Sequence, residues 1–120
     1  MGEKLVFMVT HGPAEAELAT IPFVMAGAAL ASDVAVVMGL QGDAVALAKA
    51  GVAETVAAPE FVPLGKLMGD VQALGGQLLV CSPCLKSRGI TPDQLVEGAE
   101  IVAAGRFIAE ITSATNVLTY

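Results

Sequence analysis

The segment "LLVCSPCLKSRGI" (78–90) contains both cysteines of this 120-residue chain, Cys81 and Cys84. They lie three positions apart, directly after a strongly apolar run. This CxxC spacing occurs in structural disulfides, in metal-binding sites, in redox pairs and beside sulfur-carrying nucleophiles. The choice among them depends on which elements of the fold surround the segment.

Short apolar runs alternate with helical patterns on both sides of this segment. The runs that indicate strands are 4–10, 33–39, 77–81, 99–104 and 116–120. Most of them are continuously rather than alternately apolar, which indicates burial on both faces of a sheet. The helical patterns between them cover 14–31, 44–50, 63–75, 83–88, 91–98 and 107–114. This repetition predicts an α/β fold, a three-layer α/β/α sandwich with a mainly parallel sheet of about five strands, in one domain over residues 1–120.

Two of the helical patterns carry expectations about individual residues. In the first, the residues expected to face the core are Leu18, Ile21, Met25 and Ala28. Pro22 either kinks this helix or follows the start of a new one that has Thr20 as its N-cap. Asp43 is expected to cap the helix 44–50, and Gly51 is expected to end it.

The charge balance limits the partners of the protein. Twelve acidic residues against six basic ones give a net charge of −6. This balance argues against nucleic-acid binding, which needs a basic surface, and against binding to an anionic membrane. No apolar stretch is long enough for a membrane-spanning helix, and the N-terminal apolar run is too short for a signal peptide. The sequence therefore predicts a cytoplasmic location, where neighbouring cysteines are more often reactive or metal-binding than structural.

The apolar content predicts self-association. Apolar residues make up 55% of the chain, although aromatic residues make up only 4%. A domain of this size exposes a large share of its residues, so another molecule is expected to cover part of this apolar surface. Closed symmetric homo-oligomers are the common solution. We expect the shared surface to lie close to Cys81.

Cys81 is expected at the carboxyl end of the third strand, where ligands and chemistry collect in open parallel sheets. Ser82 and Pro83 suit the entry to a short helix, which would place Cys81 at a helix N-terminus. Lys86 and Arg88 add two of the six basic residues close by. Each influence is expected to lower the thiol pKa and favour the thiolate, the form that attacks sulfur. The alternative is that Cys81 is only a small buried apolar residue.

The sequence gives less support to a metal site or a dinucleotide site. A single pair of cysteines supplies two metal ligands, whereas a structural zinc site needs four, so no metal is expected. No GxGxxG follows the first strand, so no dinucleotide cofactor is expected. His11 is the only histidine, and it follows the first predicted strand, from which it could reach the same edge of the sheet. It would tune the thiol or contact a substrate there, or else only fill its loop.

The segment VCSPCLKSRGI, followed by GAEIVAAGRFIAEITSATNVLTY, resembles the DsrE/DsrF-like family and, within it, the small YchN-like proteins. The family pattern is a strand, then a cysteine, with an Arg-Gly pair at the seventh and eighth positions after it. Cys81, Arg88 and Gly89 fit this pattern. Many YchN-like members have a second cysteine three positions after the first, which Cys84 matches. The resemblance extends over nearly the whole chain, although only this segment is specific.

The resemblance implies a compact α/β/α domain that assembles into trimers or hexamers. In the sulfur-relay branch of the family, the cysteine that matches Cys81 accepts a persulfide from a donor protein and passes it to an acceptor. Cys84 departs from that branch, and it would resolve a persulfide or close a reversible disulfide. Three functions therefore stay open: a persulfide carrier or transferase, a dithiol redox protein, and a non-enzymatic oligomeric binding module.

Overall fold

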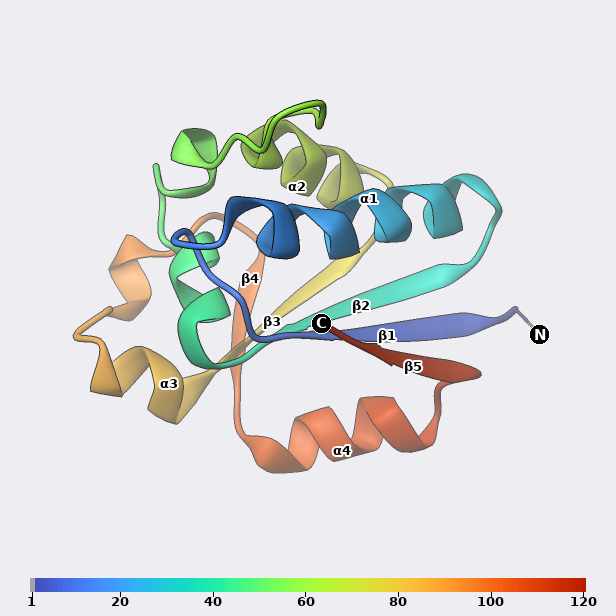
Figure 1. The fold of residues 1–120 in the computed structure, drawn as a ribbon. Helices are drawn as coiled ribbons and strands as arrows, with labels where there is room; N and C mark the ends of the chain where they lie inside the picture. The colour runs from blue at the N-terminus through green and yellow to red at the C-terminus, as the bar shows by residue number, and fades with distance from the viewer. Residues whose placement is uncertain (1) are drawn as a thin grey trace.

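The computed structural model describes residues 2–120, and within this range a five-stranded sheet lies between layers of helices (Figure 1). The strands are β1 (Lys4–Val9), β2 (Ala35–Leu40), β3 (Gln77–Cys81), β4 (Ala99–Val102) and β5 (Asn116–Thr119). All neighbouring strands are parallel, and their order across the sheet is β4-β3-β2-β1-β5. The predicted α/β fold with a parallel sheet of about five strands is confirmed.

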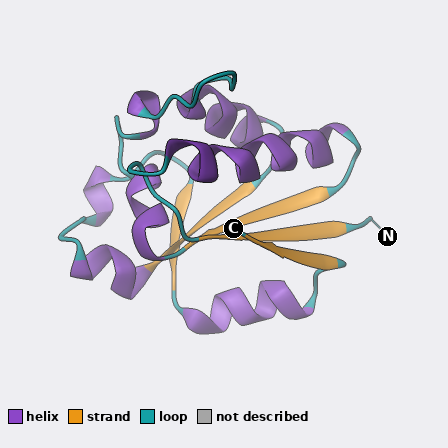
Figure 2. Cartoon of the chain, in the orientation of Figure 1, coloured by secondary structure: helices purple, strands orange, loops and turns teal. Residues whose placement is uncertain are grey.

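The helices cover the two faces of the sheet unequally. Figure 2 shows helices both above and below the sheet. The elements above are α1 (Ala16–Ala31) and α2 (Leu64–Ala73), and the helix below is α4 (Ala104–Thr112). The short helix α3 (Ser82–Ser87) follows β3 directly at one end of the sheet. Short 3₁₀ segments complete the chain, η1 (Gly42–Ala48), η2 (Ala53–Thr55) and η3 (Pro92–Gln94).

The three inner strands form the centre of the core. Strands β2 and β3 each begin with an exposed residue and are buried after it, and β1 is buried from Val6 to Val9. The edge strands β4 and β5 are shorter and more exposed. This difference explains why the inner strands are continuously apolar in sequence and the edge strands are not. None of the helices within residues 2–120 is both long and apolar enough to cross a membrane.

Strand β5 pairs with β1, so the first and last strands of the chain are neighbours in the sheet. The backbone N–H and the hydroxyl of Thr10 both donate to the carbonyl of Tyr120, at 2.9 and 2.8 Å. The rings of Phe7 and Tyr120 stack with centroids 6.2 Å apart. These contacts fix the register of an edge strand that buries little surface of its own.

Helix α1 differs from the prediction in its buried face. It continues through Pro22 without a new start, and the Thr20 hydroxyl donates to the Ala16 carbonyl at 2.6 Å instead of capping a second helix. Leu18 and Met25 were expected to face the core but are 43% and 45% exposed. The residues that are buried instead are Ala19, Thr20, Pro22, Phe23 and Ala26. The predicted face is wrong because α1 is apolar almost all round, and periodicity then does not identify the core side.

The segment after β2 also differs from the prediction. It forms the 3₁₀ segment η1 from Gly42 to Ala48 rather than an α-helix over 44–50, and Gln41 takes the N-cap position. Asp43 therefore lies inside the turn and does not cap it. Gly42 has a φ of 55°, in the left-handed region that glycine adopts without strain. This glycine starts the turn earlier than the sequence pattern indicated and leaves the Asp43 carboxylate free for another contact.

Candidate functional site

The order of the strands brings three loops together at the carboxyl end of the sheet. Strands β3, β2 and β1 are adjacent and parallel, so the segments that follow them meet at one edge. His11 and Gly12 follow β1, and Gly42 and Asp43 follow β2. A Cβ atom on Gly12 would lie 2.3 Å from the Asp43 carbonyl oxygen, which is closer than any real contact. The two loops therefore touch through their backbones, and only glycine allows this approach.

Both sulfur atoms lie at this edge, in contact with each other. Cys81 ends β3 and precedes α3, and Cys84 lies within α3. Their Sγ atoms are 2.7 Å apart, and both residues are free thiols. The Gly42 N–H donates to the Cys84 Sγ at 3.3 Å. Cys81 is buried at 8% exposure, whereas Cys84 is half-buried. The more exposed thiol is therefore also the one that receives a backbone donor from η1.

The Cys81 thiol is harder to ionise than the sequence indicated. Burial raises the pKa of the Cys81 thiol above its ordinary value, and the hydrogen bond to the Cys84 side chain adds to this rise. A backbone hydrogen bond involving Cys84 and the charge of Arg88 lower the pKa without reversing the change. The predicted lowering of the Cys81 pKa is therefore wrong. A favourable helix end and nearby cations do not compensate for taking a thiolate out of water.

Arg88 connects α3 to the turn that donates to Cys84. Its Nη2 donates to the Asp43 Oδ1 at 2.7 Å, and its Nη1 donates to the Cys84 carbonyl at 3.2 Å. Asp43 directly follows Gly42, so the ion pair holds η1 against the helix that carries Cys84. Exposed ion pairs of this kind contribute little to the free energy of unfolding. The Arg88–Asp43 pair instead has a positioning role, because it keeps the Gly42 N–H next to the Cys84 sulfur.

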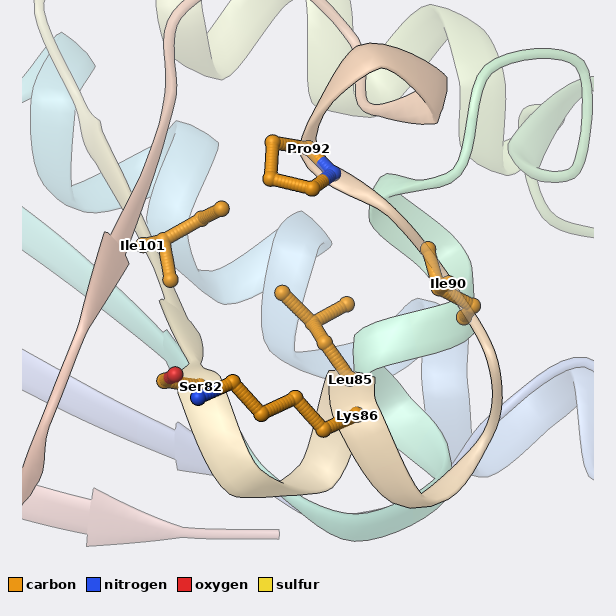
Figure 3. A pocket seen from close by; sticks show the side chains of 6 residues that line it. All are labelled: Ser82, Leu85, Lys86, Ile90, Pro92 and Ile101. Atoms are coloured by element: carbon orange, nitrogen blue, oxygen red, sulfur yellow. The ribbon is translucent and has the colours of Figure 1, made fainter.

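The other residues predicted for the site lie around this centre. The His11 Nε2 is 3.9 Å from a Glu15 carboxylate oxygen, and its Nδ1 is buried without a hydrogen-bond partner among residues 2–120. Ser82 and Lys86 instead line a separate cavity beside α3 (Figure 3). Within residues 2–120, no three His, Cys, Asp or Glu side chains lie close enough together to hold a metal ion. Of the six predicted residues, the structure brings Cys81, Cys84 and Arg88 into one connected group.

The model of the DsrE/DsrF-like family matches residues 3–120 of the chain. The chain belongs to the DsrE/DsrF-like family. Solved structures support the same fold. The YchN protein from E. coli is 23% identical with a TM-score of 0.84, over 98% of this chain and 99% of that one. MTH1491 from Methanobacterium thermoautotrophicum is 17% identical with a TM-score of 0.72, also over 98% and 99%.

This DsrE/DsrF-like chain also matches two curated proteins of Methanocaldococcus jannaschii, both described as uncharacterized. The protein MJ0760 is 34% identical over 106 residues, which are 88% of this chain and 38% of that protein. The protein MJ0989 is 34% identical over 55 residues, which are 46% of this chain and 48% of that protein. The chain therefore spans less than half the length of each of these relatives.

Two residues of the DsrE/DsrF-like site were not among the predicted site residues. Gly42 supplies the amide donor to Cys84, and Asp43 pairs with Arg88. Gly42 lies 42 positions before Cys84 and Asp43 lies 45 positions before Arg88, and the sequence pattern placed Asp43 at a helix cap. The one signal that could have identified them is their position directly after an inner parallel strand, where site residues gather.

Proposed function

We propose that this protein is a sulfur-relay protein that carries sulfur as a persulfide on Cys81. Membership of the DsrE/DsrF-like family supports a sulfur-relay function in general. The observation that carries the proposal is the pair of sulfur atoms 2.7 Å apart at the carboxyl end of β3. Cys81 is assigned as the carrier because Arg88 and Gly89 follow it at the spacing of the family pattern.

The loading step transfers one sulfur atom without net oxidation. The Cys81 thiolate attacks the terminal sulfur of a donor persulfide, a new S–S bond forms on Cys81, and the donor leaves as a thiolate. Because burial raises the pKa of Cys81, its proton has to be removed first. A base in solvent or in the donor protein takes that proton, and the Cys84 thiol, which is in contact with the Cys81 sulfur and accepts a hydrogen bond from Gly42, is placed to donate a hydrogen bond to the thiolate that remains. Cys84 thus assists loading by a hydrogen bond to the Cys81 sulfur.

The same contact favours a second candidate function, a dithiol redox protein. A Cys84 thiolate can attack the inner sulfur of a Cys81 persulfide, which forms the Cys81–Cys84 disulfide and releases sulfide as HS⁻. The sulfane sulfur is reduced to sulfide and the two cysteines are oxidised, so a reductant of the thiol class must regenerate the pair. The lifetime of the persulfide distinguishes the two functions, because a carrier has to hold its sulfur until an acceptor arrives.

We also propose that the protein works as a trimer or hexamer in the cytoplasm, with donor and acceptor proteins as partners. Exposed apolar side chains support self-association, since Leu18, Val24 and Met25 of α1 are between 37% and 45% exposed. A third possibility, a non-enzymatic oligomeric binding module, uses the same surface and leaves the cysteines without chemistry. Light scattering at micromolar concentration tests the assembly, and a mass that stays monomeric on concentration would contradict it.

Intact-mass measurement after incubation with a persulfide donor tests the sulfur chemistry. The wild-type protein is expected to gain one sulfur atom, and Cys81→Ser to gain none. Cys84→Ser is expected to load one sulfur atom as the wild type does and then to hold it longer, because the thiol that releases it is absent. Lys49→Gln serves as the control and is expected to behave as the wild type, because Lys49 forms no ion pair within residues 2–120 and lies outside α3. If Cys84→Ser alone abolishes loading, the assignment of the carrier to Cys81 is wrong. Loss of two hydrogen atoms without sulfur gain would favour the redox protein.

A further inference from the structure

A small cavity lies beside α3 at the β4 edge of the sheet. Its volume is about 100 Å³. Figure 3 shows the side chains that surround it, which come from α3, from the segment that follows it and from β4. The lining residues are Ser82, Leu85, Lys86, Ile90, Pro92 and Ile101. None of them belongs to the connected group of Cys81, Cys84 and Arg88, so the cavity is a separate feature of the molecule.

The lining combines apolar walls with one cation. Leu85 and Ile90 are almost fully buried, and Pro92 and Ile101 complete an aliphatic wall. Ser82 contributes a hydroxyl group and Lys86 an ammonium group. Among the residues that the structure describes, no ion pair includes Lys86, although four of the other basic side chains are paired. The ammonium group is therefore available to an anion that enters the cavity.

We propose that this cavity binds a small aliphatic carboxylate, with its hydrocarbon part inside and its carboxylate at Lys86 and Ser82. A cavity of about 150 Å³ lined by aliphatic side chains holds a six-carbon ring, so a volume of this size accommodates about four carbon atoms. Short branched acids have a hydrocarbon part of that size. The negative charge of such a ligand complements Lys86, and the Ser82 hydroxyl donates to one of its oxygens.

The cavity is linked to the thiols through α3. Ser82 directly follows Cys81, and Cys84 lies between Ser82 and Lys86 on the same short helix. A ligand that contacts both ends of α3 restrains the element that carries Cys84. Binding is therefore expected to slow alkylation of Cys84, although no ligand atom reaches the sulfur. Ligand binding in the cavity does not depend on persulfide chemistry. The experiment below therefore tests it separately from the proposed function.

The test uses isovalerate as the probe and the neutral isovaleramide, which has the same shape, as its partner compound. Titrations followed by two-dimensional NMR are expected to shift the amide signals of 82–92 with isovalerate, and to shift them less with isovaleramide. Lys86→Gln is expected to weaken isovalerate binding by about fivefold, the effect of losing one exposed ion pair. Lys49→Gln is the matched control, because Lys49 also forms no ion pair within residues 2–120 and lies outside the cavity.

A cavity-filling variant tests the position of the site. Ile101→Phe places a larger side chain in the cavity from the edge strand β4, where an aromatic residue is tolerated. This variant is expected to lose binding of both compounds while it keeps the wild-type fold by NMR. The proposal is overturned if isovalerate causes no shifts at 82–92, or if Lys86→Gln and Lys49→Gln bind it equally. It is also overturned if isovaleramide binds as tightly as isovalerate, since the cation would then have no role.

Discussion

Two arginine–carboxylate contacts of this molecule differ in what surrounds them. At the carboxyl end of the sheet, Arg88 pairs with Asp43, whose side chain is 75% exposed. On the side covered by α4, Arg106 pairs with Glu110, whose side chain is only 14% exposed and also pairs with Lys4 at 2.6 Å. The first contact joins η1 to the end of α3 next to the thiols. The second lies within α4, and the Lys4–Glu110 pair beside it joins that helix to the sheet.

The less exposed contact is part of a larger network. Arg106 also donates to Glu100 of β4 at 2.6 Å, so the ion pairs connect β4 to β1 through α4. Hydrogen bonds from Lys4 and then from Arg106 hold the pKa of Glu110 below its usual range. A lowered carboxyl pKa means that the charged form stabilises the folded state. The comparison therefore shows that the same kind of ion pair has two roles. The less exposed network around Glu110 stabilises the fold, and the exposed Arg88–Asp43 pair positions the thiol site.

The largest effect is expected where the site depends on backbone contact rather than on charge. Gly12→Ala is expected to lower the free energy of unfolding by about 2–3 kcal/mol, because the new Cβ atom overlaps the Asp43 carbonyl. Displacement of Asp43 should also change the alkylation rate of Cys84. Denaturant unfolding and thiol alkylation measure the two effects. Gly27→Ala is the control, since nothing lies within 4 Å of its Cβ position and α1 gains helix propensity. Equal stability of both variants would contradict this account.

The next effect tests the network around Glu110. Glu110→Gln is expected to lower the free energy of unfolding at neutral pH by about 2 kcal/mol, through the loss of charged hydrogen bonds to Lys4 and Arg106. Because the folded Glu110 pKa is lowered, this stabilisation is present above the ordinary carboxyl pKa and is lost as pH falls through the folded value. The stabilities of the variant and the wild type should therefore converge in acid. Denaturant unfolding at several pH values measures this, and a constant difference at all pH values would exclude the proposed cause.

The smallest effect on stability is expected at the exposed pair. Arg88→Lys keeps the positive charge but loses the guanidinium group, whose two terminal nitrogens contact Asp43 and the Cys84 carbonyl. The free energy of unfolding should fall by less than about 1 kcal/mol. Alkylation of Cys84 at neutral pH should slow by about two- to threefold, because the Gly42 amide is no longer held against its sulfur. Arg106→Lys gives the comparison, with lower stability and unchanged alkylation. A result in which both variants behave alike would remove the distinction between the two contacts.

Much of the fold follows from local sequence patterns. The continuous apolar runs identify the three inner strands within a few residues, because burial on both faces leaves no polar positions. Glycine at 75 ends α2 as expected, with a φ of 96°. The core-facing side of α1 could not be predicted in this way, because Leu18 and Met25 are as apolar as the buried Phe23. Only the position of the sheet decides which side of such a helix is covered.

The candidate site was predictable in part for a related reason. Cys81, Cys84 and Arg88 lie within eight consecutive positions, so their proximity follows from a short strand-to-helix turn. Gly42 and Asp43 join them only because β2 and β3 are neighbours in the sheet, and no local pattern contains that fact. The direction of the Cys81 pKa was also missed, because burial depends on the whole fold whereas charges and helix ends are visible in the sequence.

The pairing of β5 with β1 has a consequence for chain entropy. Leu5 pairs with Val36 in one neighbour strand, 31 positions away, and with Asn116 in the other, 111 positions away. Closing the longer loop costs about 1 kcal/mol more, because the closure cost grows with the logarithm of loop length. The stacked rings of Phe7 and Tyr120 and the two hydrogen bonds from Thr10 offset that cost. A single aromatic residue at the end of the last strand thus helps to hold together the two segments that are most remote along the chain.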